Sequence, residues 1–165
     1  MKNIILIGMP GSGKTTIGRQ LAKLLKLSFF DCDAEISKSQ GKSIDQIFSE
    51  QGEDFFRRLE TETIKNLPAD NFVISTGGGI IEKSENVKLL RQNGAVIFID
   101  RPTKNILSDI DTAHRPLLKN DKSRLDALFE RRIDIYNNAC DIKIKNSGTA
   151  DDAVQKIIHE VTNNG

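Results

Sequence analysis

The 165-residue sequence has no tryptophan, one tyrosine and only two cysteines. Proteins that bind single-stranded nucleic acid usually stack the bases on aromatic side chains, so this shortage argues against such a platform. The 24 basic and 23 acidic residues leave a net charge of +1, which provides no bulk attraction for nucleic acid or for a membrane surface. Any attraction for an anionic ligand must therefore come from a few local arginines. We expect neither nucleic acid nor a membrane among the partners.

Long apolar runs are also absent, since none approaches the roughly 18 residues that a membrane-spanning helix needs. The chain enters its first predicted strand by Asn3, which leaves no room before it for a secretory signal peptide. Cys32 and Cys140 lie far apart and fit no metal-ligand spacing. We expect both to be free, buried thiols in a reducing compartment, not a disulfide. These features predict a cytoplasmic protein.

The length suits one domain, and residues 1–165 contain no internal repeat, linker or low-complexity tract. Short apolar runs predict strands, and the segments between them have apolar residues at helical spacing. Continuous apolar strands that alternate with helices indicate a parallel sheet covered on both faces. The strands are predicted at residues 4–7, 27–33, 72–75, 95–99 and 141–145, and the helices at about 16–25, 44–48, 53–66, 84–92, 103–110, 123–137 and 150–161.

The stretch from Gly8 to Thr15 fits the P-loop pattern G-x-x-x-x-G-K-[ST] at each fixed position. It follows an apolar strand and opens a helix, a context that argues against the alternative of a chance match in a Gly-rich turn. Backbone N–H groups of such a loop converge on a phosphate, and the helix dipole adds its positive end. We therefore predict a nucleoside triphosphate site formed by Gly11, Ser12, Gly13, Lys14, Thr15 and Thr16.

Two other segments follow predicted strands. In a parallel sheet the ligand lies beyond the carboxyl ends of the strands, so we expect these segments to cluster with the P-loop. Three successive glycines, residues 77–79, let a backbone approach a ligand closely, although a plain loop is the alternative. Asp31 and Asp33 alternate along a strand end, so one could face a metal and the other an acceptor hydroxyl. Asp33 could instead cap a helix.

Two pairs of arginines lie on predicted helices. Arg57 is followed by Arg58, and Arg131 by Arg132. Adjacent residues on a helix point about 100° apart, so at most one of each pair faces a given site. A solvated helix surface is the alternative for each of them. A different kind of arginine, Arg115, lies in a polar segment without helical or strand periodicity, which is typical of an active-site lid.

The order of these motifs resembles that of the shikimate kinases. The P-loop alone is shared by many NTPases, whereas the ordered series is far more specific. The resemblance extends over about residues 3–161. The matching pieces are residues 8–15, Phe30-Asp31-Cys32-Asp33, Phe56-Arg57-Arg58-Leu59-Glu60, Thr76-Gly77-Gly78-Gly79, Arg115-Pro116-Leu117-Leu118, and Arg132 placed four positions before Tyr136.

The resemblance implies an α/β, three-layer P-loop kinase fold, with a five-stranded parallel sheet flanked by helices. It also implies a mobile lid at about residues 111–122 and an acceptor-binding region at about residues 33–60. The implied reaction is transfer of the γ-phosphate of ATP to the 3-hydroxyl of shikimate, giving shikimate 3-phosphate and ADP. ATP and shikimate would then be the partners, with Mg²⁺ as cofactor. The sequence does not determine the oligomeric state, and we take a monomer as the working expectation.

Roles for single residues follow from the same resemblance. Lys14, Asp33 and Arg115 are implied as catalytic, with Arg115 also reaching ATP from the lid. Thr15 and Asp31 would hold Mg²⁺, Asp31 through water. The implied shikimate-binding residues are Asp33, Arg57, Gly78, Gly79 and Arg132, with the two arginines on the carboxylate.

Two features depart from the expected pattern. The third strand ends in Ser75, not in the acidic residue of a standard Walker B strand, and Asp100 after the fourth strand fits that pattern superficially. The resemblance nevertheless favours Asp31 as the metal residue. Relatives often carry a second basic residue before Arg115, but residues 108–113 have none. Lys119 could compensate, or the grip of the lid on the nucleotide is weaker.

Other functions compete with this one. Another small-metabolite kinase, such as a gluconate kinase, would share the P-loop, but the pair Arg57 and Arg132 favours an acceptor that carries a carboxylate. A nucleoside monophosphate kinase would need phosphate clamps and a base pocket. A GTPase-like switch would bind a protein partner, but the N-K-x-D signature typical of guanine recognition is absent from the sequence.

Overall fold

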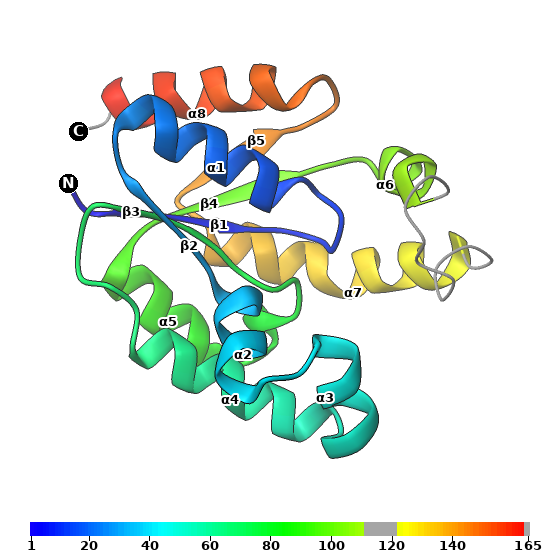
Figure 1. The fold of residues 1–165 in the computed structure, drawn as a ribbon. Helices are drawn as coiled ribbons and strands as arrows, with labels where there is room; N and C mark the ends of the chain where they lie inside the picture. Colours follow the sequence, from blue (N-terminus) through cyan, green and yellow to red (C-terminus); the bar gives the residue numbers. More distant parts are fainter. Residues whose placement is uncertain (111–121, 164–165) are drawn as a thin grey trace.

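The structure is a computed structural model that describes residues 1–110 and 122–163. Five strands form one sheet, in which every neighbouring pair is parallel, in the order β2-β3-β1-β4-β5 (Figure 1). The predicted five-stranded parallel sheet is therefore confirmed. The strands are β1 (Asn3–Ile7), β2 (Ser28–Asp31), β3 (Phe72–Ser75), β4 (Gly94–Asp100) and β5 (Ile142–Lys145).

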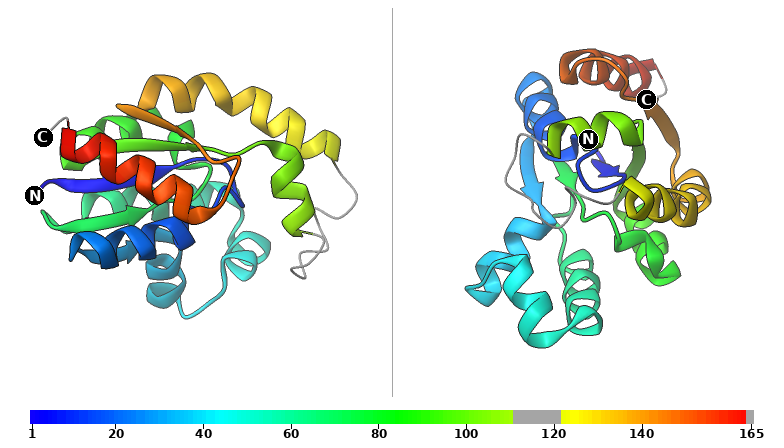
Figure 2. Two further views of the ribbon diagram at one scale, coloured as in Figure 1. Left: turned by 90° about the horizontal axis from the view of Figure 1, so that it is seen from above. Right: turned by 90° about the vertical axis from the view of Figure 1, so that its right-hand side faces the viewer.

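Helices cover both faces of the sheet, which gives the predicted three layers (Figures 1 and 2). α1 and α8 lie on one face, and α5 and α7 lie on the other with α4 beside α5, while α2 and α3 follow the end of β2. The helices are α1 (Lys14–Leu25), α2 (Cys32–Gln40), α3 (Ile44–Gln51), α4 (Glu53–Lys65), the short 3₁₀ helix η1 (Ile80–Glu82), α5 (Ser84–Asn93), α6 (Thr103–Ile110), α7 (Lys122–Ala139) and α8 (Ala150–Asn163).

The central strand β1 explains why the sheet needs helices on both sides. Its five residues are all buried, and successive side chains point to opposite faces. Ile4 and Leu6 belong to the apolar cluster that includes α1 and α8, whereas Ile5 and Ile7 belong to the cluster that includes α5 and α7. The P-loop therefore leaves a strand fixed by packing on both faces.

The second strand is shorter than predicted. It ends at Asp31, and α2 begins at Cys32, so Asp33 lies in the first turn of a helix and not on a strand end. The carboxylate of Asp31 accepts a hydrogen bond from the Ala34 N–H at 3.1 Å, which satisfies an otherwise unpaired helix donor. The predicted capping role therefore belongs to Asp31 and not to Asp33.

Other boundaries differ little from the prediction. The strand at 72–75 and the helix at 103–110 match, whereas α2 was considered only as a helix that Asp33 could cap, and η1 was not predicted. Lys122 begins α7, and the rest of the predicted lid, including Arg115, lies outside the described residues. Both cysteines are free, with Cys32 buried and Cys140 only partly buried. Within residues 1–110 and 122–163, no helix is both long and apolar enough to span a membrane.

Candidate active site

The P-loop joins β1 to α1 at the carboxyl edge of the sheet. Gly13 is the N-cap of α1 and has φ 95°, in the left-handed region that favours glycine. No side chain caps this helix end, so the first N–H groups of α1 point into the loop and are available to an anion. The loop thus has the backbone geometry that its sequence predicts.

Lys14 is the first residue of α1, and its side chain returns into the loop. Its Nζ donates to the carbonyls of Gly8 and Met9, both at 2.8 Å, and the residue is only 7% exposed. Burial lowers the pKa of Lys14 to about 8, although the carboxylates of Asp33 and Asp31 act in the opposite direction. The ammonium group is therefore costly to bury and is held close to the predicted phosphate position.

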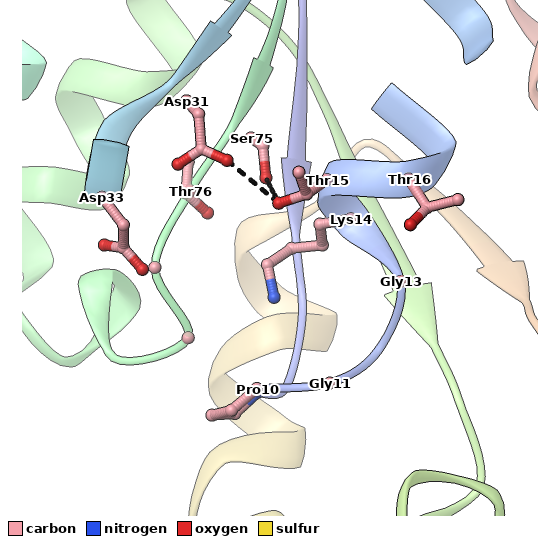
Figure 3. Close-up of a pocket in the computed structure, with 12 residues that line it drawn as sticks. Pro10, Gly11, Gly13, Lys14, Thr15, Thr16, Asp31, Asp33, Ser75 and Thr76 are labelled. Atoms are coloured by element: carbon pink, nitrogen blue, oxygen red, sulfur yellow. Dashed lines mark hydrogen bonds between the residues drawn. The ribbon is translucent and has the colours of Figure 1, made fainter. Parts of the chain in front are cut away.

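Three oxygen-bearing side chains meet beside the loop (Figure 3). The Thr15 hydroxyl donates to Asp31 Oδ2 at 3.0 Å and lies 3.4 Å from Ser75 Oγ. Asp100, the alternative metal residue, instead forms an ion pair with Lys143 at 3.2 Å. The group of Thr15, Asp31 and Ser75 faces a cavity of about 300 Å³ that is lined by Pro10, Gly11, Gly13, Lys14, Thr15, Thr16, Asp31, Asp33, Ser75, Thr76, Gly77 and Gly78.

A second cavity of about 190 Å³ adjoins the first, and the two share Pro10, Asp33, Gly77 and Gly78. All the predicted acceptor residues line it, although they come from α2, α4, the glycine loop and α7. Its lining consists of Pro10, Asp33, Ile44, Phe56, Arg57, Glu60, Gly77, Gly78, Gly79, Leu128 and Arg132. An acceptor bound there would lie beside the phosphate cavity, with Asp33 at the junction.

Ion pairs hold the first arginine of this pocket. Arg57 donates to Glu60 Oε2 at 2.7 Å and to Glu53 Oε1 at 3.2 Å, and Glu60 is only 1% exposed. Burial raises the pKa of Glu60 above its ordinary value, although the hydrogen bond and the charge of Arg57 act in the opposite direction. The terminal nitrogens of Arg57 would collide with any Cβ at position 79, so the third glycine leaves room for the guanidinium group. The sequence had shown Glu60 only as part of a motif, without a role.

The second arginine is paired with a residue that sequence reasoning missed. Arg132 Nε donates to Glu82 Oε1 at 3.0 Å, and the Arg132 side chain is 6% exposed. Arg131 donates to the same oxygen at 2.7 Å. Helical geometry had suggested that Arg131 and Arg132 face different surroundings, but both contact Glu82. Arg58 is exposed and lies over the ring of Phe55. Of the two arginines that flank Arg57 and Arg132, only Arg58 is therefore remote from the pocket, and Arg131 is not.

Two further polar residues support the loops. The buried Tyr136 donates through its hydroxyl to the Gly78 carbonyl at 2.6 Å, and burial raises its pKa to about 12. Asn146, at the end of β5, donates to the Ser12 carbonyl at 3.0 Å. Tyr136 was recognised only by its spacing from Arg132, and no sequence pattern had singled out Asn146. A polar residue directly after a predicted strand was the available signal.

The geometry agrees with the comparisons to known proteins. A model of the shikimate kinase family matches residues 10–162. The chain is 50% identical to a shikimate kinase of Clostridium botulinum, with 99% of this chain and 100% of that one covered. Shikimate kinase from Acinetobacter baumannii, solved in complex with shikimate, has a TM-score of 0.91 and 36% identity, with coverage of 99% and 94%. The structure of the Aquifex aeolicus shikimate kinase has a TM-score of 0.86 and 40% sequence identity, with 98% of this chain and 97% of that one covered. The chain belongs to the shikimate kinase family.

Proposed function

We propose that this protein transfers the γ-phosphate of ATP to the 3-hydroxyl of shikimate, giving shikimate 3-phosphate and ADP. The observation that carries the proposal is the pocket in which Asp33, Arg57 and Arg132 meet beside the P-loop cavity. Shikimate is a small polyhydroxylated carboxylate, and guanidinium groups bind carboxylates through two parallel hydrogen bonds. The relative from Acinetobacter baumannii in complex with shikimate supports the same acceptor.

On the nucleotide side, phosphoryl transfer requires mainly positioning and neutralisation of charge. The N–H groups at the start of α1 would hold the phosphates, with Gly11, Ser12, Gly13 and Thr16 completing the loop. Lys14 would exchange its bonds to the carbonyls of Gly8 and Met9 for bonds to the β- and γ-phosphates. It would then stabilise the charge that shifts toward the leaving oxygen.

The residues around Thr15 fit a magnesium ion. Hydroxyl and carboxylate oxygens are the ligands Mg²⁺ prefers, and Thr15, Asp31 and Ser75 bring them together. Asp31 is the only carboxylate of these three residues, so water and phosphate oxygens would supply most of the other ligands of the ion. Thr15 would bind the ion directly, and Asp31 through water. When bound, Mg²⁺ would neutralise charge on the phosphates.

On the acceptor side, Asp33 would hold the hydroxyls of shikimate and take the proton of the 3-hydroxyl as it attacks. Arg57 and Arg132 would hold the carboxylate at the other end, and the backbone of Gly78 and Gly79 would complete the contact. These residues lie on different elements, so the acceptor is fixed at two ends. Its hydroxyl would thereby be oriented toward the P-loop cavity.

Arg115 lies outside the described residues, and its role rests on the family resemblance. We propose that it binds ATP from the lid predicted at about residues 111–122, where it would stabilise charge in the transition state. Closure of this lid would exclude water, which otherwise competes with the hydroxyl as acceptor.

A coupled assay of ADP release tests the proposed reaction. Purified protein with MgATP should release ADP when shikimate is added, and not with gluconate, with AMP or without an acceptor. Release with gluconate or AMP but not with shikimate would replace the proposal with one of the alternative kinases. Hydrolysis of GTP without any acceptor would instead favour a switch protein.

A further inference from the structure

Glu82, the last residue of η1, contacts three arginines around the acceptor pocket. Its Oε1 accepts from Arg132 Nε at 3.0 Å and from Arg131 Nη2 at 2.7 Å, and its Oε2 lies 3.9 Å from Arg57 Nη2. Among the described residues, the pocket lining includes Arg57 and Arg132 but not Glu82. Glu82 therefore contacts the proposed carboxylate-binding arginines without itself lining the pocket.

The contact fixes one edge of a guanidinium that is itself buried. An arginine side chain has many rotamers, so a binding site gains when the protein, and not the substrate, selects the bound one. With Nε held by Glu82, the orientation of the guanidinium plane of Arg132 is set before any ligand arrives. Burial acts to raise the pKa of Glu82, but hydrogen bonds from Arg132 and Arg131 hold its pKa below the ordinary value. The carboxylate is thus ionised at neutral pH.

The backbone position of Glu82 adds to this effect. η1 directly follows the glycine loop 77–79 and packs against α7, so Glu82 connects the loop to the helix that carries Arg132. Asn86 ties the same segment down, since its Nδ2 donates to the Ile80 carbonyl at 2.9 Å. Because η1 is held by this hydrogen bond and by its packing against α7, the Glu82 carboxylate has a fixed position from which it can orient Arg132.

We propose that Glu82 is a positioning residue that orients Arg132 toward the carboxylate of the acceptor. This inference rests on the proposed function, because it assigns Glu82 a part in binding that substrate. The competing role is that of an internal carboxylate which occupies the arginines and must be displaced by the acceptor. The two roles predict opposite changes in the KM for shikimate when Glu82 is replaced.

Steady-state kinetics of Glu82→Ala, Glu82→Gln and a control variant, Arg58→Ala, separate these roles. Glu82→Ala should raise the KM for shikimate about tenfold, with kcat and the KM for ATP within about twofold, since an oriented charged contact is lost. Glu82→Gln keeps an acceptor oxygen for Arg132 Nε, and its KM should rise by only about threefold. Arg58→Ala, the matched control, removes an exposed arginine that is not part of the pocket lining and should stay within about twofold.

Two further measurements show that the effect passes through Arg132. In an Arg132→Ala background, either Glu82 replacement should change the KM for shikimate by less than about twofold, because the group to be oriented is gone. With the methyl ester of shikimate, which lacks the anionic carboxylate, kcat/KM of Glu82→Ala should match that of the wild type. If the alanine variant fails to fold, the glutamine variant carries both tests.

A lower KM for shikimate in either Glu82 variant would establish the competing role and overturn the proposal. An unchanged KM, or a loss that persists in the Arg132→Ala background or with the ester, would also overturn it. These results would leave the proposed reaction intact, because the wild-type protein would still release ADP with shikimate. A wild-type protein that releases none would instead overturn both.

Discussion

The nucleotide half and the acceptor half of the proposed site differ in the groups that form them. The proposed nucleotide half is one contiguous loop, residues 8–16, whose groups available to a ligand are mostly backbone N–H groups at the start of α1. The acceptor half consists of side chains from α2, α4, η1 and α7, held in place by ion pairs. Backbone geometry tolerates changes of most side chains, whereas an ion-pair network does not. The two halves should therefore respond differently to mutation.

The nucleotide and acceptor halves also differ in how the replacement of a proposed binding residue affects the stability of the fold. The P-loop leaves a strand buried on both faces, and its one buried charge, Lys14, opposes folding. In the acceptor half, the buried Glu60 is compensated by Arg57, so removal of the binding residue leaves a buried charge without its main partner. Variants of the nucleotide half should lose activity alone, and some variants of the acceptor half should lose stability as well.

Replacement of Lys14 by methionine should give the largest loss of activity. The variant lacks the charge on the transferred phosphate, so we expect turnover to fall at least about 10³-fold. Methionine fits a buried position and removes a desolvated charge, so the melting temperature should be maintained. ADP release and thermal unfolding measure the two effects. Turnover close to the wild-type value would remove Lys14 from the chemistry.

Replacement of Arg132 by alanine should give the next largest effect, and only on the acceptor. We expect the KM for shikimate to rise by about 10- to 150-fold, which corresponds to 1.5–3 kcal/mol for a hydrogen bond to a charged group. The KM for ATP should change little. The remote, exposed Arg58→Ala is the matched control. An equal loss of affinity for both substrates would mean that Arg132 supports the fold or the nucleotide half.

Arg57→Ala should weaken shikimate binding to a similar extent but should also destabilise the protein. It leaves the buried Glu60 without its closest cation, a change that typically costs about 3 kcal/mol. Double replacement of Arg57 by methionine and Glu60 by glutamine should recover part of the stability but none of the shikimate affinity. Chemical denaturation together with kinetics separates the two. Full stability in the single variant would contradict the contrast drawn between the halves.

The same contrast explains what could be predicted from sequence. The P-loop motif occupies consecutive residues, so the sequence alone predicts the nucleotide half, and the parallel sheet followed from the alternation of strands and helices. Whether Asp31 or Asp33 caps α2 depends on where the chain leaves the sheet, which no local pattern fixes. The role proposed for Glu82 depends on its contact with Arg132 of α7, fifty positions further along the chain. Ion pairs between distant segments are not visible in a single sequence.

Gly79→Ala tests the close approach of the glycine loop to Arg57. The backbone at Gly79 has φ −91°, which alanine adopts without strain, so the only cost is displacement of the guanidinium group. We expect about a fivefold rise in the KM for shikimate and a loss of about 1 kcal/mol in unfolding free energy. The steric control is Gly148→Ala, where the new methyl group would meet Asp152 Oδ2. An unchanged KM would show that Arg57 has room to move.

The smallest expected effect is a pH dependence that belongs to the nucleotide half alone. The pKa of Lys14 is lowered to about 8, so kcat/KM for ATP should fall to half near that pH and decline about tenfold per unit above it. Burial raises the pKa values of Cys32 and Tyr136, which removes them as sources of this decline. The unfolded chain binds the Lys14 proton more tightly than the folded one. Stability relative to Lys14→Met should therefore rise between about pH 8 and the ordinary lysine pKa. A flat kcat/KM profile up to pH 9.5 would mean that the Lys14 ammonium is better stabilised than its burial indicates.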